Sequence, residues 1–320
     1  MGDFLRFLPG VAAAYGALET EGVLIRGFPA NLSVVSFDGA QLASANLSGE
    51  RDFSPSRIGV NSISRVEVTK VPLPSTAADT MSGSINLVSK SAFERSAAEF
   101  KYRVGLSSNQ QSFALKKTPD AYNERTYKIY PDFNFDYTLP IGKNFGVVLT
   151  GVYAQKFNEQ NISRKTWSNA GTDTGASVAN PFLQQFLIQD SPRYTNRSIY
   201  SAKADWRVTP NSVLTFGSRY GKNVRASTGH TTMTPSAGTV GTPTPATGTR
   251  LSSGPDFTIG ATGRGALTVT GGWQYSADYT SGTNLGYRYD DGKWRIEANA
   301  NYSQSETILP STTRGHFNNV

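Results

Sequence analysis

The stretch SISRVEVTKVPLPSTAADTMSGSINLVSK, residues 62–90, decides how the start of the chain folds. In its first part Val66 and Val68 alternate with charged residues, which is the period-2 pattern of a strand with one buried face. Two prolines then end this strand, because proline has no N–H to give to a ladder. After a turn-rich segment, Ile85 and Leu87 resume the alternation. The stretch therefore predicts two short strands joined by a polar connection.

The residues before this stretch also combine short runs typical of strands with turn residues. Residues 23–26 and 33–38 are predicted to be strands, and Asp38-Gly39 a turn. Residues 3–8 are predicted to form a short helix that ends before a Pro-Gly pair. The start of the chain is therefore expected to be a small mixed α/β domain.

Four pieces of this region occur in the order and spacing of one receptor family. They are Ile25-Arg26-Gly27-Phe28, the run VVSFDG at 34–39, and the segments 62–72 and 82–90. They resemble the plug domain of TonB-dependent outer-membrane receptors. The resemblance assigns the plug motif to Arg26, Gly27, Asp38, Gly39, Arg65, Glu67, Lys70, Pro72, Gly83 and Asn86. Val71 stands where the family usually has Gly before Pro72, which leaves the geometry of that turn open.

From residue 97 onward, apolar and polar residues alternate over longer runs. Phe133, Phe135 and Tyr137, for example, are separated by single polar residues. Such runs predict seven strands, near residues 97–107, 131–139, 145–157, 197–208, 213–223, 279–290 and 293–304. Each strand is close to the ~9–11 residues that a tilted membrane strand needs.

The two faces of these strands differ in polarity. Lys203, Asp205 and Arg207 share one side of a strand, and Tyr200 and Trp206 share the other. In a membrane barrel the charged side must line water or a plug, because a charge facing lipid costs about 2–4 kcal/mol near the midplane. A soluble sandwich would bury the apolar side instead. Aromatic residues gather at strand ends, as in membrane girdles, but the sequence alone leaves both architectures open.

Short and long connections alternate along the predicted strands. Short turns near 140–144, 209–212 and 290–293 separate long loops near 158–196 and 224–277, as in outer-membrane barrels. Residues 267–270 are predicted to form a β-ribbon within the second long loop.

These patterns together predict the fold class and the domains. We expect a plug domain over residues 1–93, followed over residues 94–320 by part of an antiparallel transmembrane β-barrel. Seven strands is an odd number, whereas plugged transporters have about 22 strands, so the sequence is expected to be a fragment of a larger receptor. The start lacks the basic segment and apolar core of a secretory signal, so we expect Met1 not to be the true start and the signal to lie upstream.

Residues suited to catalysis or metal binding are scarce. The chain has no Cys, and its two histidines, His230 and His316, lie in low-complexity or terminal segments where nothing marks a partner. The run DDGK at 290–293 fits a hairpin turn better than a calcium loop, and residues 260–265 lack the flanking elements of a phosphate loop. The net charge of +7 is spread along the chain, which gives no support for a nucleic-acid partner. The sequence predicts no enzyme, no cofactor and no metal.

The resemblance also implies a function. It implies TonB-dependent import of a scarce solute (a siderophore, a cobalamin or a saccharide) across the outer membrane of a Gram-negative cell. The implied partners are TonB with its inner-membrane energising complex, outer-membrane lipid and the unknown solute; the segment that contacts TonB is expected upstream. Ligand contacts are expected in the plug loop 41–53, at Asn46, Arg51 and Asp52.

Two other classes of protein remain open. One is a small outer-membrane barrel of about eight strands with a structural or adhesive role. The other is a secreted β-rich carbohydrate-binding module or enzyme. An eighth strand would favour the first, and solubility without detergent would favour the second.

Overall fold

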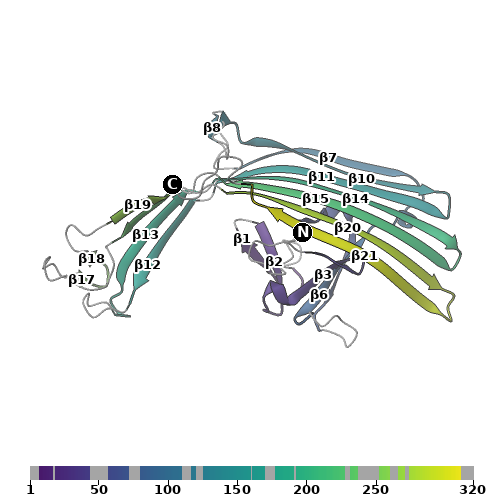
Figure 1. The fold of residues 1–320 in the computed structure, drawn as a ribbon, viewed down its shortest axis with the longest axis horizontal. Coiled ribbons are helices and arrows are strands. Elements are labelled where there is room, and N and C mark those ends of the chain that lie inside the picture. Colours follow the sequence, from purple (N-terminus) through teal and green to yellow (C-terminus); the bar gives the residue numbers. More distant parts are fainter. Residues whose placement is uncertain are drawn as a thin grey trace.

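The structure is a computed structural model that describes residues 7–16, 19–43, 57–71, 80–109, 117–119, 125–159, 161–169, 177–190, 192–227, 231–236, 252–259, 266–270 and 274–310. Strands dominate these ranges. They form a small N-terminal domain, a long seven-stranded sheet and a separate four-stranded sheet at one end of the long strands (Figure 1). Throughout these ranges, no helix has the length and apolar character needed to cross a membrane.

The N-terminal domain combines a hairpin with a mixed sheet. The hairpin pairs β1 (Val11–Gly16) with β2 (Glu19–Ile25). The sheet has the order β4-β3-β6-β5, in which only β3 and β6 run parallel. Its strands are β3 (Ser33–Phe37), β4 (Ala40–Gln41), β5 (Ile63–Thr69) and β6 (Gly83–Ser89). In the described residues, the 3-10 turns η1 (Ala30–Leu32), η3 (Val60–Ser62) and η4 (Ala92–Glu94) accompany them.

The apolar face that the alternation predicts is the core of this domain. Ile85 and Leu87 of β6 are each 1% exposed, and Val66 and Val68 of β5 pack against them. The buried cluster is Val11, Val23, Ile25, Val35, Phe37, Ile58, Ile85 and Leu87. Burial of one face across β3, β5 and β6 fixes the register, since a slip by one residue would turn that face to solvent.

The predicted turn at Asp38-Gly39 is confirmed, and its backbone explains the glycine. Asp38 and Gly39 have φ values of 51° and 78°, and they join Phe37 of β3 to its register partner Ala40 of β4. Two successive positive φ values are typical of a type I′ turn, which favours Asp-Gly because glycine adopts this conformation without steric cost.

Two expectations for the N-terminal domain require revision. The helix predicted for residues 3–8 lies mostly outside the described residues, and Phe7 and Leu8 form a turn in which the Leu8 carbonyl accepts from Val11 N. The described part of the domain has 3-10 turns but no α-helix, so the α component of the predicted α/β plug is not confirmed. Strand β1 was not predicted, because its sequence VAAAYG does not alternate; pairing with β2 determines it.

The seven predicted barrel strands form one antiparallel sheet with the order β21-β20-β15-β14-β11-β10-β7. The strands are β7 (Glu99–Ser108), β10 (Ile129–Ile141), β11 (Phe145–Asn158), β14 (Arg193–Thr209), β15 (Ser212–Ser227), β20 (Gln274–Asp290) and β21 (Arg295–Ile308). The three short turns also lie where they were predicted. In the described residues the sheet is open, with β7 and β21 at its edges.

Most of these strands are longer than predicted, chiefly at the ends that lead into the long loops. β14 has 17 residues, and Arg193 still pairs with Ser227 of β15. At about 3.3 Å per residue, β14 rises about 55 Å, well beyond a hydrocarbon layer of about 30 Å. Hydropathy predicts only the part of a strand that would cross a membrane, whereas the ladder continues past it.

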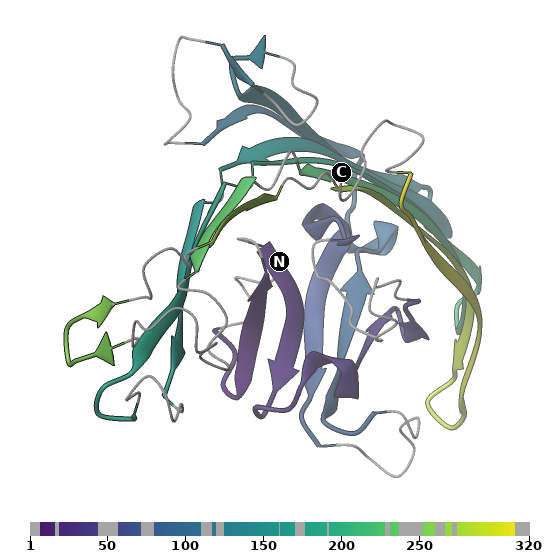
Figure 2. The same cartoon turned by 60° about the vertical axis from the view of Figure 1, so that its left-hand side comes forward.

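The sheet curves around the N-terminal domain and turns its polar side toward it. Figure 2 shows the domain on the concave side of the arch. Trp206 is 50% exposed on the convex side, whereas its neighbour Asp205, on the concave side, is 2% exposed. Phe100, Phe133, Leu149, Tyr200, Phe216 and Leu285 are likewise exposed. This polarity is the reverse of a soluble sandwich, which would bury the apolar side.

The two long loops pair with each other. β12 (Asn161–Ser168), β13 (Phe182–Asp190), β16 (Thr231–Ser236) and β19 (Ala266–Thr270) form a four-stranded sheet in that order. The β-ribbon predicted at 267–270 is confirmed as β19, whereas β12 and β13 were not predicted. Two short ribbons complete the described strands, β8 (Thr118–Pro119) with β9 (Arg125–Thr126) and β17 (Ser252–Ser253) with β18 (Thr258–Ile259).

Candidate functional site at the domain–sheet interface

Four of the predicted motif residues meet in one hydrogen-bonded chain on the N-terminal sheet. Asn86 Oδ1 accepts from Gly39 N at 2.9 Å, and Asn86 Nδ2 donates to Glu67 Oε2 at 2.9 Å. Arg65 Nε donates to Glu67 Oε1 at 2.8 Å. The chain ties the β3–β4 turn to β6 and β5. These bonds hold the pKa of Glu67 below its usual value, the bond from Asn86 contributing most and the bond from Arg65 next.

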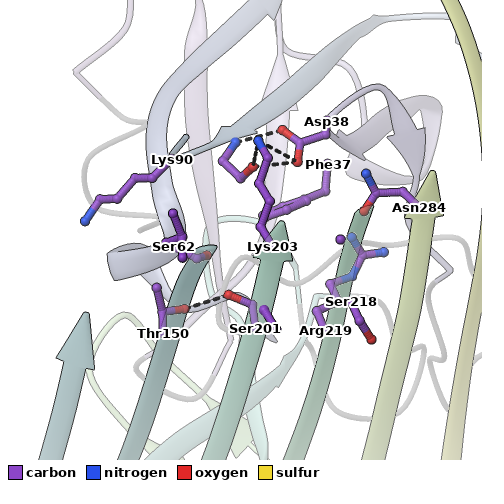
Figure 3. A pocket seen from close by; sticks show the side chains of 14 residues that line it. Phe37, Asp38, Ser62, Lys90, Thr150, Ser201, Lys203, Ser218, Arg219 and Asn284 are labelled. Carbon is purple, nitrogen blue, oxygen red and sulfur yellow. Dashed lines mark hydrogen bonds and ion pairs between the residues drawn. The ribbon is translucent and has the colours of Figure 1, made fainter. Parts of the chain in front are cut away.

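Asp38 connects the motif to the seven-stranded sheet. Its Oδ1 accepts from Ser89 N at 2.8 Å and its Oδ2 from Ser89 Oγ at 2.6 Å. Lys203 Nζ of β14 lies 3.9 Å from Asp38 Oδ2 and donates to Ser89 Oγ at 2.7 Å. Figure 3 shows the Lys203 side chain extending from its strand toward Asp38. Asp38 therefore also links the N-terminal domain to β14, a role that its place in a turn motif did not predict.

The remaining motif residues lie apart from this chain of bonds. Arg26 and Gly27 are exposed in the turn where Phe28 N donates to Ile25 O. Gly83 is buried, and a methyl group there would come within 2.5 Å of the Thr69 carbonyl. Lys70 follows β5. Pro72 and the three expected ligand residues, Asn46, Arg51 and Asp52, lie outside the described residues.

The first contact between domain and sheet is the Ser91 anchor, which comprises residues 89–93 and β14. The buried carboxylate of Asp205 accepts from Ser91 Oγ at 2.7 Å, from Ala92 N at 3.3 Å and from Thr215 Oγ1 at 3.0 Å. The Arg207 guanidinium lies 4.7 Å from the centre of the Phe93 ring. The charged face of β14 therefore lines the domain, as expected for a plugged barrel.

Lys90 adds an ion pair to this anchor. Its Nζ pairs with Asp136 of β10, on the same concave face. The anchor therefore reaches both β10 and β14 from one short segment that leads directly into β7.

The second contact is the Asn61 anchor. Asn61 Nδ2 donates to the carbonyl oxygens of Phe135 at 2.7 Å and Gly151 at 3.1 Å, and these two residues are register partners on β10 and β11. A methyl group on Gly59 would come within 3.4 Å of the Val152 side chain and 3.7 Å of Ile199. The domain therefore lies against the backbone of the sheet here, with little room between them.

The third contact is the Arg57 anchor, which faces β20 and β21. Arg57 Nη2 lies 3.7 Å from Asp278 Oδ2, and the Asp278 carboxylate is 1% exposed. Arg225 donates to the same oxygen at 3.0 Å, and Thr307 donates to Oδ1 at 2.8 Å. Nearby, Ala43 N donates to Ser303 Oγ at 3.0 Å.

Most of these contacts could not be predicted from the sequence. Asn61 and Phe135 are 74 residues apart, and no local pattern marks such a pair. Asp278 did carry a usable signal, because a carboxylate in a strand that would cross a membrane needs a partner. The prediction of a charged inner face at Lys203 and Asp205 used that same signal.

Other candidate sites add little in the described part of the chain. The DDGK run forms the predicted hairpin turn, in which Asp291 Oδ1 accepts from Lys293 N at 2.9 Å and Trp294 N at 2.6 Å. No three His, Cys, Asp or Glu residues gather into a metal site in the ranges described above. Both histidines and residues 260–265 lie outside those ranges.

The geometry of the interface suits an N-terminal domain that is held against the sheet and can be released from it. Its three anchors consist of hydrogen bonds and ion pairs, and hollows no larger than a water molecule or two lie between them. Polar contacts of this kind can be exchanged for water at small net free-energy cost. A continuous apolar interface would not allow this.

Comparison with known proteins identifies the N-terminal domain. Residues 1–86 match the family described as TonB-dependent Receptor Plug Domain. The whole chain is similar in outline to a variant of the ferric enterobactin receptor of Pseudomonas aeruginosa (11% identity, TM-score 0.44, covering 97% of this chain and 53% of that one). It is also similar to the siderophore receptor PiuA of Acinetobacter baumannii (16% identity, TM-score 0.42, covering 95% and 43%). The chain thus spans about half the length of these receptors. The predicted resemblance is confirmed over residues 1–86, which match the plug-domain family of TonB-dependent receptors.

Proposed function

We propose that the whole protein is an outer-membrane receptor that imports a scarce solute, and that TonB and its inner-membrane complex energise this import. Residues 1–93 would be the plug, and residues 94–320 would form part of the barrel wall. The role is binding and transport, without catalysis. Ferric siderophores, cobalamins and saccharides are the solute classes to test.

One observation carries this proposal: a plug domain lies on the charged concave side of a sheet whose convex side is apolar. Tyr200 and Trp206 are about half exposed on the convex side, while Lys203 and Asp205 contact the plug. A surface of this kind suits lipid outside and a polar plug inside. The secreted carbohydrate-binding alternative requires the opposite polarity.

Transport through such a sheet requires the plug to move. The Ser91, Asn61 and Arg57 anchors hold it by polar contacts, which a pulling partner can exchange for water. The ligand residues Asn46, Arg51 and Asp52 remain part of the proposal, as contacts on the outer side of the plug.

Uptake in paired strains tests the proposal. Cells that make the intact receptor, with and without TonB, would be given radiolabelled ferric siderophores, cobalamin and oligosaccharides in parallel. We expect uptake of at least one solute, and loss of that uptake without TonB. Uptake that does not depend on TonB, or purification of the receptor as a detergent-free soluble monomer, would rule the proposal out.

A further inference from the structure

The four-stranded sheet of the long loops (β12, β13, β16 and β19), here called the blade, continues four strands of the seven-stranded sheet, the wall. The blade order β12-β13-β16-β19 matches the wall order β11-β14-β15-β20, and each blade strand joins the wall strand at the same place in that order. Figure 1 shows the blade at an angle to the wall strands. The blade is therefore a bent extension of the wall, to which both long loops contribute.

The strands are interrupted at one level across the sheet. The wall strands end in a single row of register partners, Asn158, Arg193, Ser227 and Gln274. Only two or three residues separate each wall strand from its blade strand. The four interruptions therefore lie side by side and form one line across the sheet, which we call the crease.

The register on either side of the crease accounts for the bend. Between β11 and β14, pairing resumes three residues beyond the last wall pair on both strands, so the register is kept. Between β14 and β15, Arg193 pairs with Ser227 in the wall and Asp190 with Thr231 in the blade, so one strand advances three residues and the other four. One extra residue on one strand is the count of a β-bulge, which bends a strand and increases its twist.

The sequence at the crease also favours an interruption. Pro192 falls between β13 and β14, and proline has no N–H to give to a ladder. Gly229 falls between β15 and β16, and Gly271 and Gly272 fall between β19 and β20. Glycine weakens a strand and often marks a bend. These residue types favour a break in the ladder over its continuation.

Main-chain pairing joins the two long loops within the blade. β13 belongs to the first loop and β16 to the second, and their register partners include Gln185 with Ser236 and Ile188 with Met233. β12 and β19 extend the pairing on either side. The two loops can therefore move separately only if these pairs break, whereas they can move together without such a loss.

We propose that the blade turns about the crease as one body, so that whatever binds one long loop also moves the other. A few residues at the ends of elements are enough to absorb such a rotation. This inference rests on the proposed import function, in which the long loops lie outside the cell. A solute held by either loop would then change the position of both loops relative to the plug.

Pairs of spin labels test this inference. The chain has no cysteine, so each label needs only one substitution. Asn161→Cys with Ala266→Cys joins the two loops within the blade, roughly 20 Å apart by strand spacing and rise. Lys165→Cys with Tyr200→Cys spans the crease, from β12 to β14. Double electron–electron resonance would measure both distance distributions on the intact receptor, otherwise free of cysteine, in lipid vesicles without solute.

The distribution across the crease should be broader than the distribution within the blade. Pro192→Ala combined with deletion of Gly229 removes a proline and the extra residue, so this variant should lose the excess width across the crease and keep the distribution within the blade. Pro181→Ala replaces a proline of the same loop away from the crease. It is the matched control and should change neither distribution.

Three results would overturn the inference. A broad distribution within the blade would mean that the two loops move separately, and equal widths for the two pairs would mean that the crease does not bend. These two results need only the labelled parent receptor, so they remain decisive if the crease variant fails to fold. A folded crease variant that keeps the excess width would place the bend elsewhere.

The label distances and the uptake result can fail separately. The distances require neither solute nor TonB. A blade that turns as one body without TonB-dependent uptake would count against the proposed function alone. TonB-dependent uptake with any of the three contrary distance results would count against the crease alone.

Discussion

Asp205 of β14 joins the plug directly to the seven-stranded sheet. It is buried, and it accepts bonds from Ser91, Ala92 and Thr215 while Lys203 lies 4.0 Å away. A carboxylate so enclosed stabilises the interface only while its partners stay in place, because a buried charge without partners is costly.

Asp205→Asn should therefore loosen the Ser91 anchor. The amide keeps the shape but loses the charge-assisted bonds, so we expect the plug to lose about 1–3 kcal/mol of stability. Hydrogen exchange at the amides of residues 89–93, measured on the intact receptor in detergent, would report the loss. Asp132→Asn, on the same concave face, is the control. Equal exchange in the two variants would contradict the role given to Asp205.

Glu67 predicts a pH dependence. Its pKa is lowered from its usual value of 4.5 by the bonds from Asn86 and Arg65. Its contribution to plug stability is therefore present above that value and is lost as the pH falls through the lowered pKa. In Glu67→Gln, the stability of the plug should depend less on pH in this acidic window. Denaturant unfolding of the plug, from neutral to acidic pH, measures the free energy of unfolding in both proteins. If this free energy depends on pH equally in both, the pH dependence does not come from Glu67.

At the residue scale, only features that depend on local sequence could be predicted. The turn at Asp38-Gly39 and the apolar faces of β5 and β6 follow from local pattern, and they were predicted correctly. The contacts of Asn61 and Arg57 depend on which distant strand lies opposite, and period and propensity do not contain that information. The expected ligand residues Asn46, Arg51 and Asp52 remain predictions.

At the scale of elements, the barrel strands were the most predictable part. All seven predicted strands are present in one sheet, because residues that alternate in polarity suit a strand whose two faces meet different surroundings. β12 and β13 were missed inside a predicted loop, because their sequences do not alternate regularly between apolar and polar residues. β1 was missed for a related reason: its run of alanines favours no strand until β2 pairs with it.

The convex face of β14 predicts the effect of a misplaced charge. Ala202 lies between Tyr200 and Trp206 in sequence and on the same face, so Ala202→Arg would direct a cation toward lipid. The folded receptor should lose about 2–4 kcal/mol in a bilayer if the site lies near the midplane. Ala202→Leu, the control, should be nearly neutral. Folding into lipid vesicles monitored by denaturant titration measures both variants, and equal stability would argue against lipid contact.

At the scale of the whole molecule, the sheet has two unpaired edges in the described residues, and its convex side is apolar. Residues 1–320 expressed alone and kept in water should therefore aggregate, because unpaired edges and an exposed apolar face both favour association. Light scattering after size exclusion, with and without detergent, would measure this. A monomeric product that melts cooperatively in water would contradict the membrane assignment.

The contact between Asn61 and the main chain has a consequence for how such receptors diversify. The carboxamide reads only the oxygens of Phe135 and Gly151, which every amino acid supplies. Replacement of side chains along β10 and β11 can then change the convex face of the sheet without removing this contact to the plug. The two parts can therefore change in sequence independently at this contact, and any plug that carries an asparagine here could make the same two hydrogen bonds.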